Sequence, residues 1–195
     1  MCAAVGQPDR FGNNGVVSTT TYVALLRGVN VAGRAVPMDA LRGIFCGLGH
    51  QDVTTYIQSG NVVFRTPEED HDVLADEIHS AIASEIGHRV TVVLRTPEQL
   101  ALVVAHNPLD DGRESRGLHV TFLAQAPDPL RMDAITPVAG VSDEFRRIGK
   151  EIFVYCRDGY GRTRLTNDFF ERRLGIAATT RNWRTVTTLA RMAAA

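Results

Sequence analysis

The order of apolar segments in the first half of the chain limits the folds open to it more than any other feature. Residues 20–28 form a compact apolar run rich in strand-forming side chains. Apolar residues then recur at helical spacing over residues 38–48. Residues 53–66 hold two β-rich segments around a polar turn, as a hairpin does. A second amphipathic helix after Glu68 and a strand at 90–95 complete the order.

Strand, helix, strand, strand, helix, strand is the split β-α-β order of ferredoxin-like domains. The second helix of this order is expected to bury an apolar face made of Val73, Ile78, Ile82 and Ile86. Every side chain from Tyr22 to Leu26 is apolar or aromatic, so the first strand is expected to be buried on both faces. Such a strand implies layers above and below its sheet, one of which the second half of the chain would supply.

The second half of the chain predicts another α+β unit, a degenerate echo of the first. Its expected elements are a helix starting at Thr96, a polar linker or mobile loop at 109–117, a strand at 119–124, a short helix at 128–134, a hairpin at 144–157 that turns at Gly149 and Lys150, and two helices starting at Thr166 and near Thr180. We therefore predict an α+β fold of two ferredoxin-like half-domains packed together. Their predicted ranges are 21–95 and 96–195, after a loose N-terminal tail at 1–20.

Composition predicts where the protein is located. The chain of 195 residues is 44% hydrophobic and has no apolar run near the roughly 18 residues of a membrane span, so no membrane insertion is expected. Residues 1–20 lack the basic start and the continuous apolar stretch of a secretory signal. The three cysteines are an odd number without CxxC spacing, which fits unpaired thiols in a reducing compartment. We expect a cytoplasmic protein.

Charge is unevenly distributed along the chain, although its formal net charge is only -1. Residues 1–144 carry 10 basic and 18 acidic side chains, whereas residues 145–195 carry 11 basic and 4 acidic ones. A cationic module of this kind binds an anionic partner or docks on the acidic part of its own chain. Both interpretations stay open at this point.

Three polar stretches are candidates for function. The first, Gly28–Ala35, follows a strand and has the glycine spacing of a phosphate-binding P-loop. Arg34 and Ala35 stand where that loop needs a lysine and a magnesium-binding hydroxyl, so kinase or ATPase activity is not expected. A flexible turn is the simpler interpretation, with Arg27 and Asn30 as candidate ligand contacts.

The second stretch, Gln58, Ser59, Gly60 and Asn61, lies between two β-forming segments. Small and polar residues are what a tight turn needs, so a structural role competes with ligand binding here. The stretch lacks the stacked aromatic rings of an RNA-recognition domain, and the strand after it offers only Phe64.

The third stretch, residues 159–167 and 179–184, combines arginines with two expected helix starts. Thr166 and Thr180 are predicted to cap helices, whose N-termini carry free N–H groups and partial positive charge. On a helical wheel Arg181, Arg184 and Arg191 share one face, with Trp183 on the other. This arrangement predicts an anion site, while a capped, salt-bridged helix pair explains the same residues equally well. The arginines proposed for the site are Arg162, Arg164, Arg181 and Arg184.

Titratable residues show no pattern typical of a metal site or a hydrolase. The six histidines have neither HxxxH nor HExxH spacing, so zinc is not expected. The chain also lacks the GxSxG elbow of serine hydrolases. We predict no metal and no cofactor, and the sequence leaves open whether the protein is an enzyme.

Five segments of the chain resemble a known family. They are LLRGVNVAGR (25–34), TYIQSGNVVF (55–64), HNPL (106–109), HVTFL (119–123) and the long segment 161–189. The family that they resemble is catalogued as domain of unknown function 1697, over about residues 22–192. The positions that match its signature are Arg27, Gly28, Asn30, Gln58, Ser59, Gly60, Asn61, Leu165, Thr166, Asn167, Thr180, Arg181, Asn182 and Trp183. The resemblance implies a bacterial-type cytoplasmic α+β protein of ferredoxin-like halves with no established activity.

The leading hypothesis is a binding protein whose three polar stretches meet in a cleft between the halves. The ligand would bear a phosphate, as a nucleotide or single-stranded nucleic acid does, and bind through charge-assisted hydrogen bonds. A small-molecule enzyme and a protein-interaction module without a small ligand are the alternatives. The candidate ligand-binding residues are Arg27, Asn30, Gln58, Ser59, Asn61, Arg162, Arg164, Asn167, Thr180, Arg181, Asn182 and Arg184.

Overall fold

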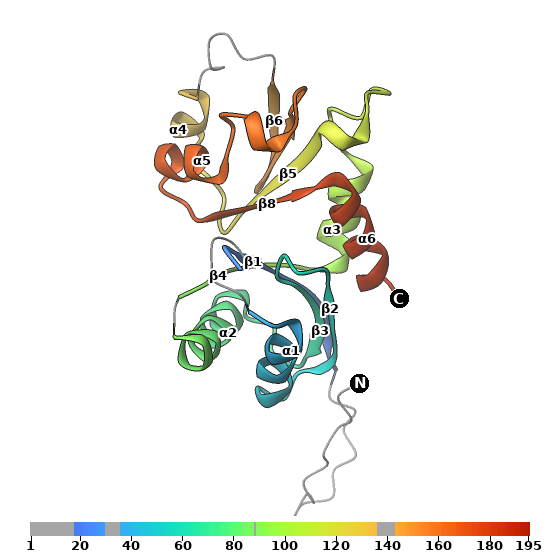
Figure 1. Ribbon diagram of the computed structural model, residues 1–195, viewed down its shortest axis with the longest axis vertical. Helices are drawn as coiled ribbons and strands as arrows, with labels where there is room; N and C mark the ends of the chain where they lie inside the picture. The colour runs from blue at the N-terminus through green and yellow to red at the C-terminus, as the bar shows by residue number, and fades with distance from the viewer. Residues whose placement is uncertain (1–17, 30–35, 88, 136–142) are drawn as a thin grey trace, which may run out of the picture. The chain divides into compact units, whose positions relative to one another are not determined.

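The computed structural model describes residues 18–29, 36–87, 89–135 and 143–195. Contacts between residues divide the chain into two compact units, the first ending at Thr96 and the second beginning at Pro97. Figure 1 labels the helices and strands of both units. Asn30 and the rest of 30–35 lie outside the described residues, as does most of the tail predicted at 1–20.

The first unit contains four strands and two helices among its described residues. They are β1 (Thr20–Arg27), α1 (Met38–Gly47), β2 (Gln51–Tyr56), β3 (Asn61–Thr66), α2 (His71–Ile86) and β4 (Thr91–Arg95). The strands form one antiparallel sheet in the order β2-β3-β1-β4. The element order predicted from the apolar segments is therefore present in the structure.

Both helices of the first unit pack on one face of its sheet (Figure 1). Leu41 and Phe45 of α1 join a buried core with Tyr22, Ala24 and Leu26 of β1. The core contribution of α2 is Leu74, Ile78 and Ile82, which recur at intervals of four residues. Val73, predicted to belong to this apolar face, is instead 54% exposed, because Leu74 occupies the inward position of its turn. Val23 and Leu25, on the other face of β1, are also fully buried, as expected.

The second unit contains the remaining elements. They are α3 (Pro97–Ala105), the 3-10 turn η1 (Ser115–Gly117), β5 (Leu118–Leu123), α4 (Pro129–Asp133), β6 (Glu144–Ile148), β7 (Glu151–Tyr155), the 3-10 turn η2 (Tyr160–Arg162), α5 (Asn167–Leu174), β8 (Ala178–Asn182) and α6 (Trp183–Ala193). Its antiparallel sheet has the order β6-β7-β5-β8. Counted within each unit, this strand order is the same as in the first unit.

The helices of the second unit form two groups. Helices α4 and α5 cover one face of the sheet, where Met132, Phe169 and Phe170 pack against Ile152 and Val154 of β7. Helices α3 and α6 lie side by side (Figure 1). One part of the core of this unit therefore lies on the face covered by α4 and α5, and polar side chains on that face require an explanation. Val120, Phe122 and Phe153 on the opposite face are buried as well.

The prediction of a helix starting near Thr180 is wrong. Residues 178–182 form strand β8, and α6 begins only at Trp183. Its N-cap is Asn182, whose side chain accepts a hydrogen bond from the backbone N–H of Thr185 at 2.8 Å. Because Arg181 belongs to a strand, the helical wheel that placed it beside Arg184 does not apply. The predicted N-cap Thr166 is confirmed, since it accepts from the N–H of Phe169.

Cys156 is a buried free thiol in the core of the second unit, as predicted. In the part of the chain that the structure describes, the helices are too short or too polar to span a membrane.

Candidate functional site

Four polar side chains lie together on the face of the second sheet that α4 and α5 cover. His119 of β5 is paired with Asn182 of β8, and Thr121 with Thr180. Residues directly opposite in an antiparallel pair project from the same face, so all four share it. Two positions further along, the same face becomes apolar with Leu123 and Ala178. The polar group therefore occupies one end of an otherwise apolar face.

A chain of hydroxyl hydrogen bonds connects these strands to the start of α5. The Thr180 hydroxyl donates to Oδ1 of Asn167 at 2.6 Å, and it lies 2.7 Å from the hydroxyl of Thr121. Since the one proton of Thr180 goes to Asn167, Thr121 must be the donor to Thr180. The side-chain amide nitrogen of Asn167 makes no hydrogen bond to a described residue and is available as a donor.

His119 is held as a neutral imidazole with one defined tautomer. Its Nδ1 lies 3.1 Å from the carbonyl oxygen of Gly117, which can only accept, so Nδ1 carries the proton and Nε2 is an acceptor. Burial lowers the pKa of His119 below its ordinary value, against a smaller opposing effect of the Gly117 carbonyl. The ring is half-buried, and Nε2 has no hydrogen-bond partner in the described part of the chain.

Tyr160 of η2 covers His119. The two rings are stacked, with centroids 4.8 Å apart and planes 28° apart. The Tyr160 hydroxyl is buried and has no hydrogen-bond partner among the described residues. Burial raises the pKa of Tyr160, while the nearby Thr180 side chain and Asn167 backbone oppose this without reaching hydrogen-bond geometry. An unpaired buried hydroxyl costs roughly 1–3 kcal/mol, which marks this position as unusual.

Three of the predicted arginines lie close in sequence to residues of this group. Arg162 belongs to the same 3-10 turn as Tyr160, and Arg164 lies between that turn and α5. Arg184 lies in the first turn of α6, two residues after Asn182. All three side chains are exposed. We name the set His119, Thr121, Tyr160, Asn167, Thr180 and Asn182 the polar cluster, and Arg162, Arg164 and Arg184 its arginines.

Arg181, by contrast, projects from the opposite face of β8. It pairs with Val120, not with Thr121, and its side chain is only 8% exposed. Its guanidinium donates to the Thr179 hydroxyl at 2.7 Å and to the Thr180 carbonyl at 2.9 Å. Burial lowers the pKa of Arg181 to about 10, so the group is still charged at neutral pH. The expectation that Arg181 and Arg184 share one face is therefore wrong.

The first and second polar stretches meet within the first unit. The N–H of Leu26 donates to the carbonyl of Gly60 at 2.8 Å, and a Cβ on Gly60 would lie 3.1 Å from that of Val29. Asn61 is fully buried, and its amide donates to the Tyr56 carbonyl at 3.0 Å and to the Ser59 hydroxyl at 2.9 Å. Its amide therefore stabilises the turn, as the structural interpretation of this stretch required.

The predicted site residues thus fall into separate groups. Asn167, Thr180 and Asn182 come together in the polar cluster of the second unit. In the first unit, Gln58 and Ser59 lie in the turn at 57–60, and Arg27 ends strand β1. The sequence did not point to His119, Thr121 or Tyr160 as ligand-binding residues, although Tyr160 lies within the third polar stretch. The hydroxyl pair Thr121 and Thr180 is 59 positions apart, and His119 lies in a segment that looks like an ordinary strand. Only the pairing of β5 with β8, itself missed, reveals this cluster.

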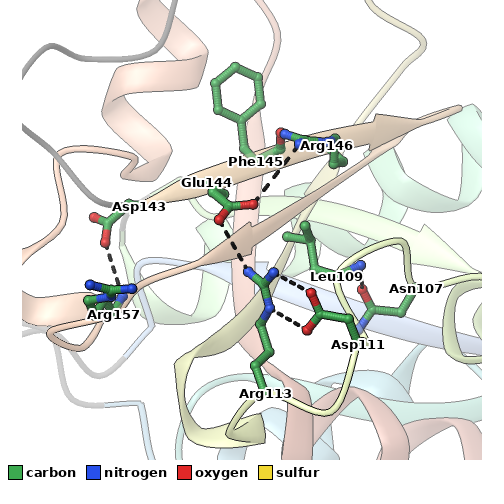
Figure 2. A network of polar contacts seen from close by, with 9 residues as sticks. All are labelled: Asn107, Leu109, Asp111, Arg113, Asp143, Glu144, Phe145, Arg146 and Arg157. Carbon is green, nitrogen blue, oxygen red and sulfur yellow. Dashed lines mark hydrogen bonds and ion pairs between the residues drawn. The ribbon is translucent and has the colours of Figure 1, made fainter.

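Two consecutive carboxylates, Asp143 and Glu144, bind neighbouring loops of the second unit (Figure 2). Glu144 pairs with Arg113 at 3.5 Å, and Arg113 also binds Asp111 and stacks over the ring of Tyr155. Asp143 accepts from the backbone N–H of Arg157 at 3.0 Å. The loop at 109–117, predicted as a linker or mobile loop, therefore lies within the second unit and is tied to β6 and β7.

The remaining features of the described residues that could form a site are groups of metal ligands and grooves. Within the described ranges, His, Cys, Asp and Glu side chains form no group of three or more that could hold a metal ion. A groove of about 530 Å³ lies between α1 and α2 of the first unit. Its lining is mostly small or apolar, with Gly43, Gly47 and Leu48 among its residues, but it also contains Glu85, and it includes no predicted site residue.

Comparison with known proteins gives a family and a fold. A model of the family described as "Protein of unknown function (DUF1697)" matches residues 19–153, so segment 161–189 lies beyond the match. A solved structure, "The structure of conserved bacterial protein SP0830 from Streptococcus pneumoniae", shares 20% identity with this chain at a TM-score of 0.74. The alignment covers 91% of this chain and 100% of that one, and at this identity it shows the fold alone. No curated protein matches the chain.

Proposed function

Since the chain belongs to the DUF1697 family, whose description states no function, we propose one from the geometry of the second unit. The polar cluster and its arginines bind a small molecule that bears a phosphate group, with a nucleotide as the leading class. The observation that carries the proposal is the stacked pair of His119 and Tyr160, whose unpaired polar atoms lie on segments that also carry exposed arginines.

The arginines supply the charge that a phosphate needs. Guanidinium groups form paired, charge-assisted hydrogen bonds with phosphate oxygens, each worth more than a neutral hydrogen bond. Arg162 is in the turn that holds Tyr160, and Arg184 follows the strand residue that pairs with His119. The Asn167 amide adds a neutral donor. In this arrangement the arginines bind the phosphate, and the Asn167 amide binds another polar group of the ligand.

Charge favours a small ligand over nucleic acid. Counted over the second unit, residues 97–195, there are 14 basic and 12 acidic side chains. Nucleic-acid-binding domains usually carry a strong excess of positive charge along one surface. The cationic quarter found in the sequence is therefore largely balanced within its own unit, which supports a local phosphate site.

Several finer expectations stay predictions. We propose a ferredoxin-like architecture for both units, supported by their shared strand order. A cytoplasmic location and ligand contacts of Arg27, Gln58 and Ser59 are further parts of the proposal. Buried Arg181 and Asn61 have structural roles in their strand and turn, and Asn30 lies outside the described residues.

Fluorescence of Trp183, the only tryptophan, tests the proposal because this residue begins α6 directly after Asn182. Adenosine monophosphate, inorganic phosphate and a single-stranded oligonucleotide would be titrated at low and at physiological salt. We expect a saturable change with the nucleotide. The double variant Arg162→Gln, Arg184→Gln should weaken its binding by about tenfold or more.

The control is Arg191→Gln, which removes an exposed arginine from the same helix two turns further along. It should bind as the wild type does. Equal losses in the control and the double variant would indicate a general effect of charge and contradict a local site. Tighter, steeply salt-dependent binding of the oligonucleotide would instead favour nucleic acid as the ligand.

A second candidate function is an enzyme that acts on such a ligand. It is favoured by the two perturbed titratable groups, since burial lowers the pKa of His119 and raises that of Tyr160 at one place. Incubation with phosphate esters, followed by ³¹P NMR, would show new phosphorus signals if the protein catalyses their conversion. Unchanged spectra alongside saturable binding would leave ligand binding as the function.

A further inference from the structure

The orientation of His119 is fixed from the side of its Nδ1. The Gly117 carbonyl accepts both from Nδ1 of His119, at 3.1 Å, and from the N–H of Cys156, at 2.8 Å. A side chain at Gly117 would come within 2.7 Å of the Tyr155 ring, so the backbone approaches this ring closely. The loop that ends at Gly117 is held in turn by Arg113 and Glu144 (Figure 2). The ring of His119 is therefore held at Nδ1 by the Gly117 carbonyl, and Nε2 lies on the other side of the ring.

Asp143, which precedes Glu144 in the chain, holds the turn that carries Tyr160. Asp143 accepts from the Thr163 hydroxyl at 2.6 Å and from the N–H of Arg157 at 3.0 Å. The N–H of Thr163 donates to the Tyr160 carbonyl at 3.4 Å, which closes the turn that carries the ring. Asp143 thus holds the turn that carries Tyr160, and Glu144 holds the loop that leads into the strand of His119. Such preorganisation is typical of a binding site.

The unpaired atoms of this cluster differ in what they can bind. Nε2 of His119 is an acceptor, and the amide nitrogen of Asn167 is a donor. The oxygens of a dianionic phosphate are acceptors only, so they can pair with the amide or an arginine but not with neutral Nε2. A hydroxyl group both donates and accepts, and it can therefore satisfy either atom.

We propose that Nε2 of His119 accepts a hydrogen bond from a hydroxyl group of the ligand, which therefore carries a free hydroxyl as well as a phosphate. Ribonucleotides and sugar phosphates have this chemistry. The inference rests on the proposed function and narrows its ligand class. Arginines hold the phosphate in this arrangement, and His119 distinguishes hydroxylated ligands from those without the hydroxyl.

Calorimetric titration of the full chain tests this with three probes: adenosine monophosphate, its 2′,3′-dideoxy analogue and inorganic phosphate. Wild-type protein should bind the dideoxy analogue about fivefold more weakly than the parent nucleotide, the loss of one hydrogen bond. The variant His119→Phe keeps an aromatic ring against Tyr160 but removes the acceptor. It should bind both nucleotides equally weakly and inorganic phosphate as well as the wild type does, which is the signature of a direct pair.

The matched control is His106→Phe, since His106 also lies 3.1 Å from a backbone carbonyl through Nδ1 but is exposed at the end of α3. It should leave all three affinities unchanged. Equal wild-type affinity for the two nucleotides overturns the inference without any variant. So does an equal loss of nucleotide and inorganic phosphate in His119→Phe. If none of the three probes binds the wild type, the proposed function fails, and the inference fails with it.

Discussion

Two glycines of the polar stretches have the same backbone conformation in different surroundings. Gly28 has φ of 74° and Gly60 has φ of 72°, both in the left-handed region that side chains disfavour. A Cβ on Gly60 would lie 2.9 Å from the Cβ of Leu26 and 3.1 Å from that of Val29. A Cβ on Gly28 would meet no heavy atom of the described residues within 4 Å. Alanine at Gly28 would therefore meet backbone strain alone, whereas alanine at Gly60 would meet strain and a steric clash.

Gly60→Ala should lower the free energy of unfolding by about 2–4 kcal/mol, because strain and overpacking both act there. Gly28→Ala should cost only about 1 kcal/mol, since strain alone remains. Urea denaturation of both variants and the wild type would measure the difference. Equal losses would show that the turn does not pack against the end of β1 as described.

Residue patterns predicted the local role of some side chains and missed the distant ones. Gln58–Asn61 was expected to form a tight turn, and the structure has a turn at 57–60 that the Asn61 amide stabilises. Local turn chemistry depends on neighbours in sequence, so it is readable there. His119 and Tyr160 come together only through the pairing of strands and the anchoring of a loop. Neither residue type nor spacing encodes that contact.

At the scale of elements, most segments occur where periodicity placed them. The hairpin at 144–157, the short helix α4 and helix α5 with its Thr166 cap agree with the sequence analysis. Strand β8 is the exception. Thr179 and Thr180 favour strands because they are β-branched, yet threonine before an apolar run is also a helix start signal. Pairing with β5 decides between them, and that interaction is not local.

The position of the true N-cap can be tested by substitution. Asn182→Ala should lower the free energy of unfolding by about 1 kcal/mol, because the N–H of Thr185 loses its acceptor. Asn182→Ser keeps a capping oxygen and should restore most of the loss. Thermal unfolding followed by circular dichroism would measure both. Unchanged stability of Asn182→Ala would show that α6 does not depend on this cap.

At the scale of the whole chain, topology was more accessible from sequence than chemistry. The first unit follows directly from the apolar pattern, and the second repeats its strand order although the sequence has no strict internal repeat. Burial requires only apolar side chains at the correct period, which many sequences satisfy. The charge count, by contrast, suggested a cationic module that the structure does not have as a separate unit. Residues 145–195 belong to a unit that also contains the acidic residues between 97 and 144.

Each unit also contains a histidine that links stability to pH. His50 packs against the rings of Phe45 and Phe64, and its Nε2 is buried without a hydrogen-bond partner among the described residues. Burial lowers the pKa of both His50 and His119. An unfolded histidine has a pKa of about 6.5, so below that pH the unfolded chain binds protons that the folded units resist.

Stabilisation by the neutral imidazoles is therefore complete above about pH 6.5 and is lost as the pH falls below it, by at most about 1.4 kcal/mol per pH unit for each histidine. Urea denaturation across this range should show His50→Phe and His119→Phe each losing less stability than the wild type on acidification. Because carboxylates contribute a common background, the difference in slope from the wild type is the informative quantity. Identical slopes in all three proteins would contradict burial of the neutral rings.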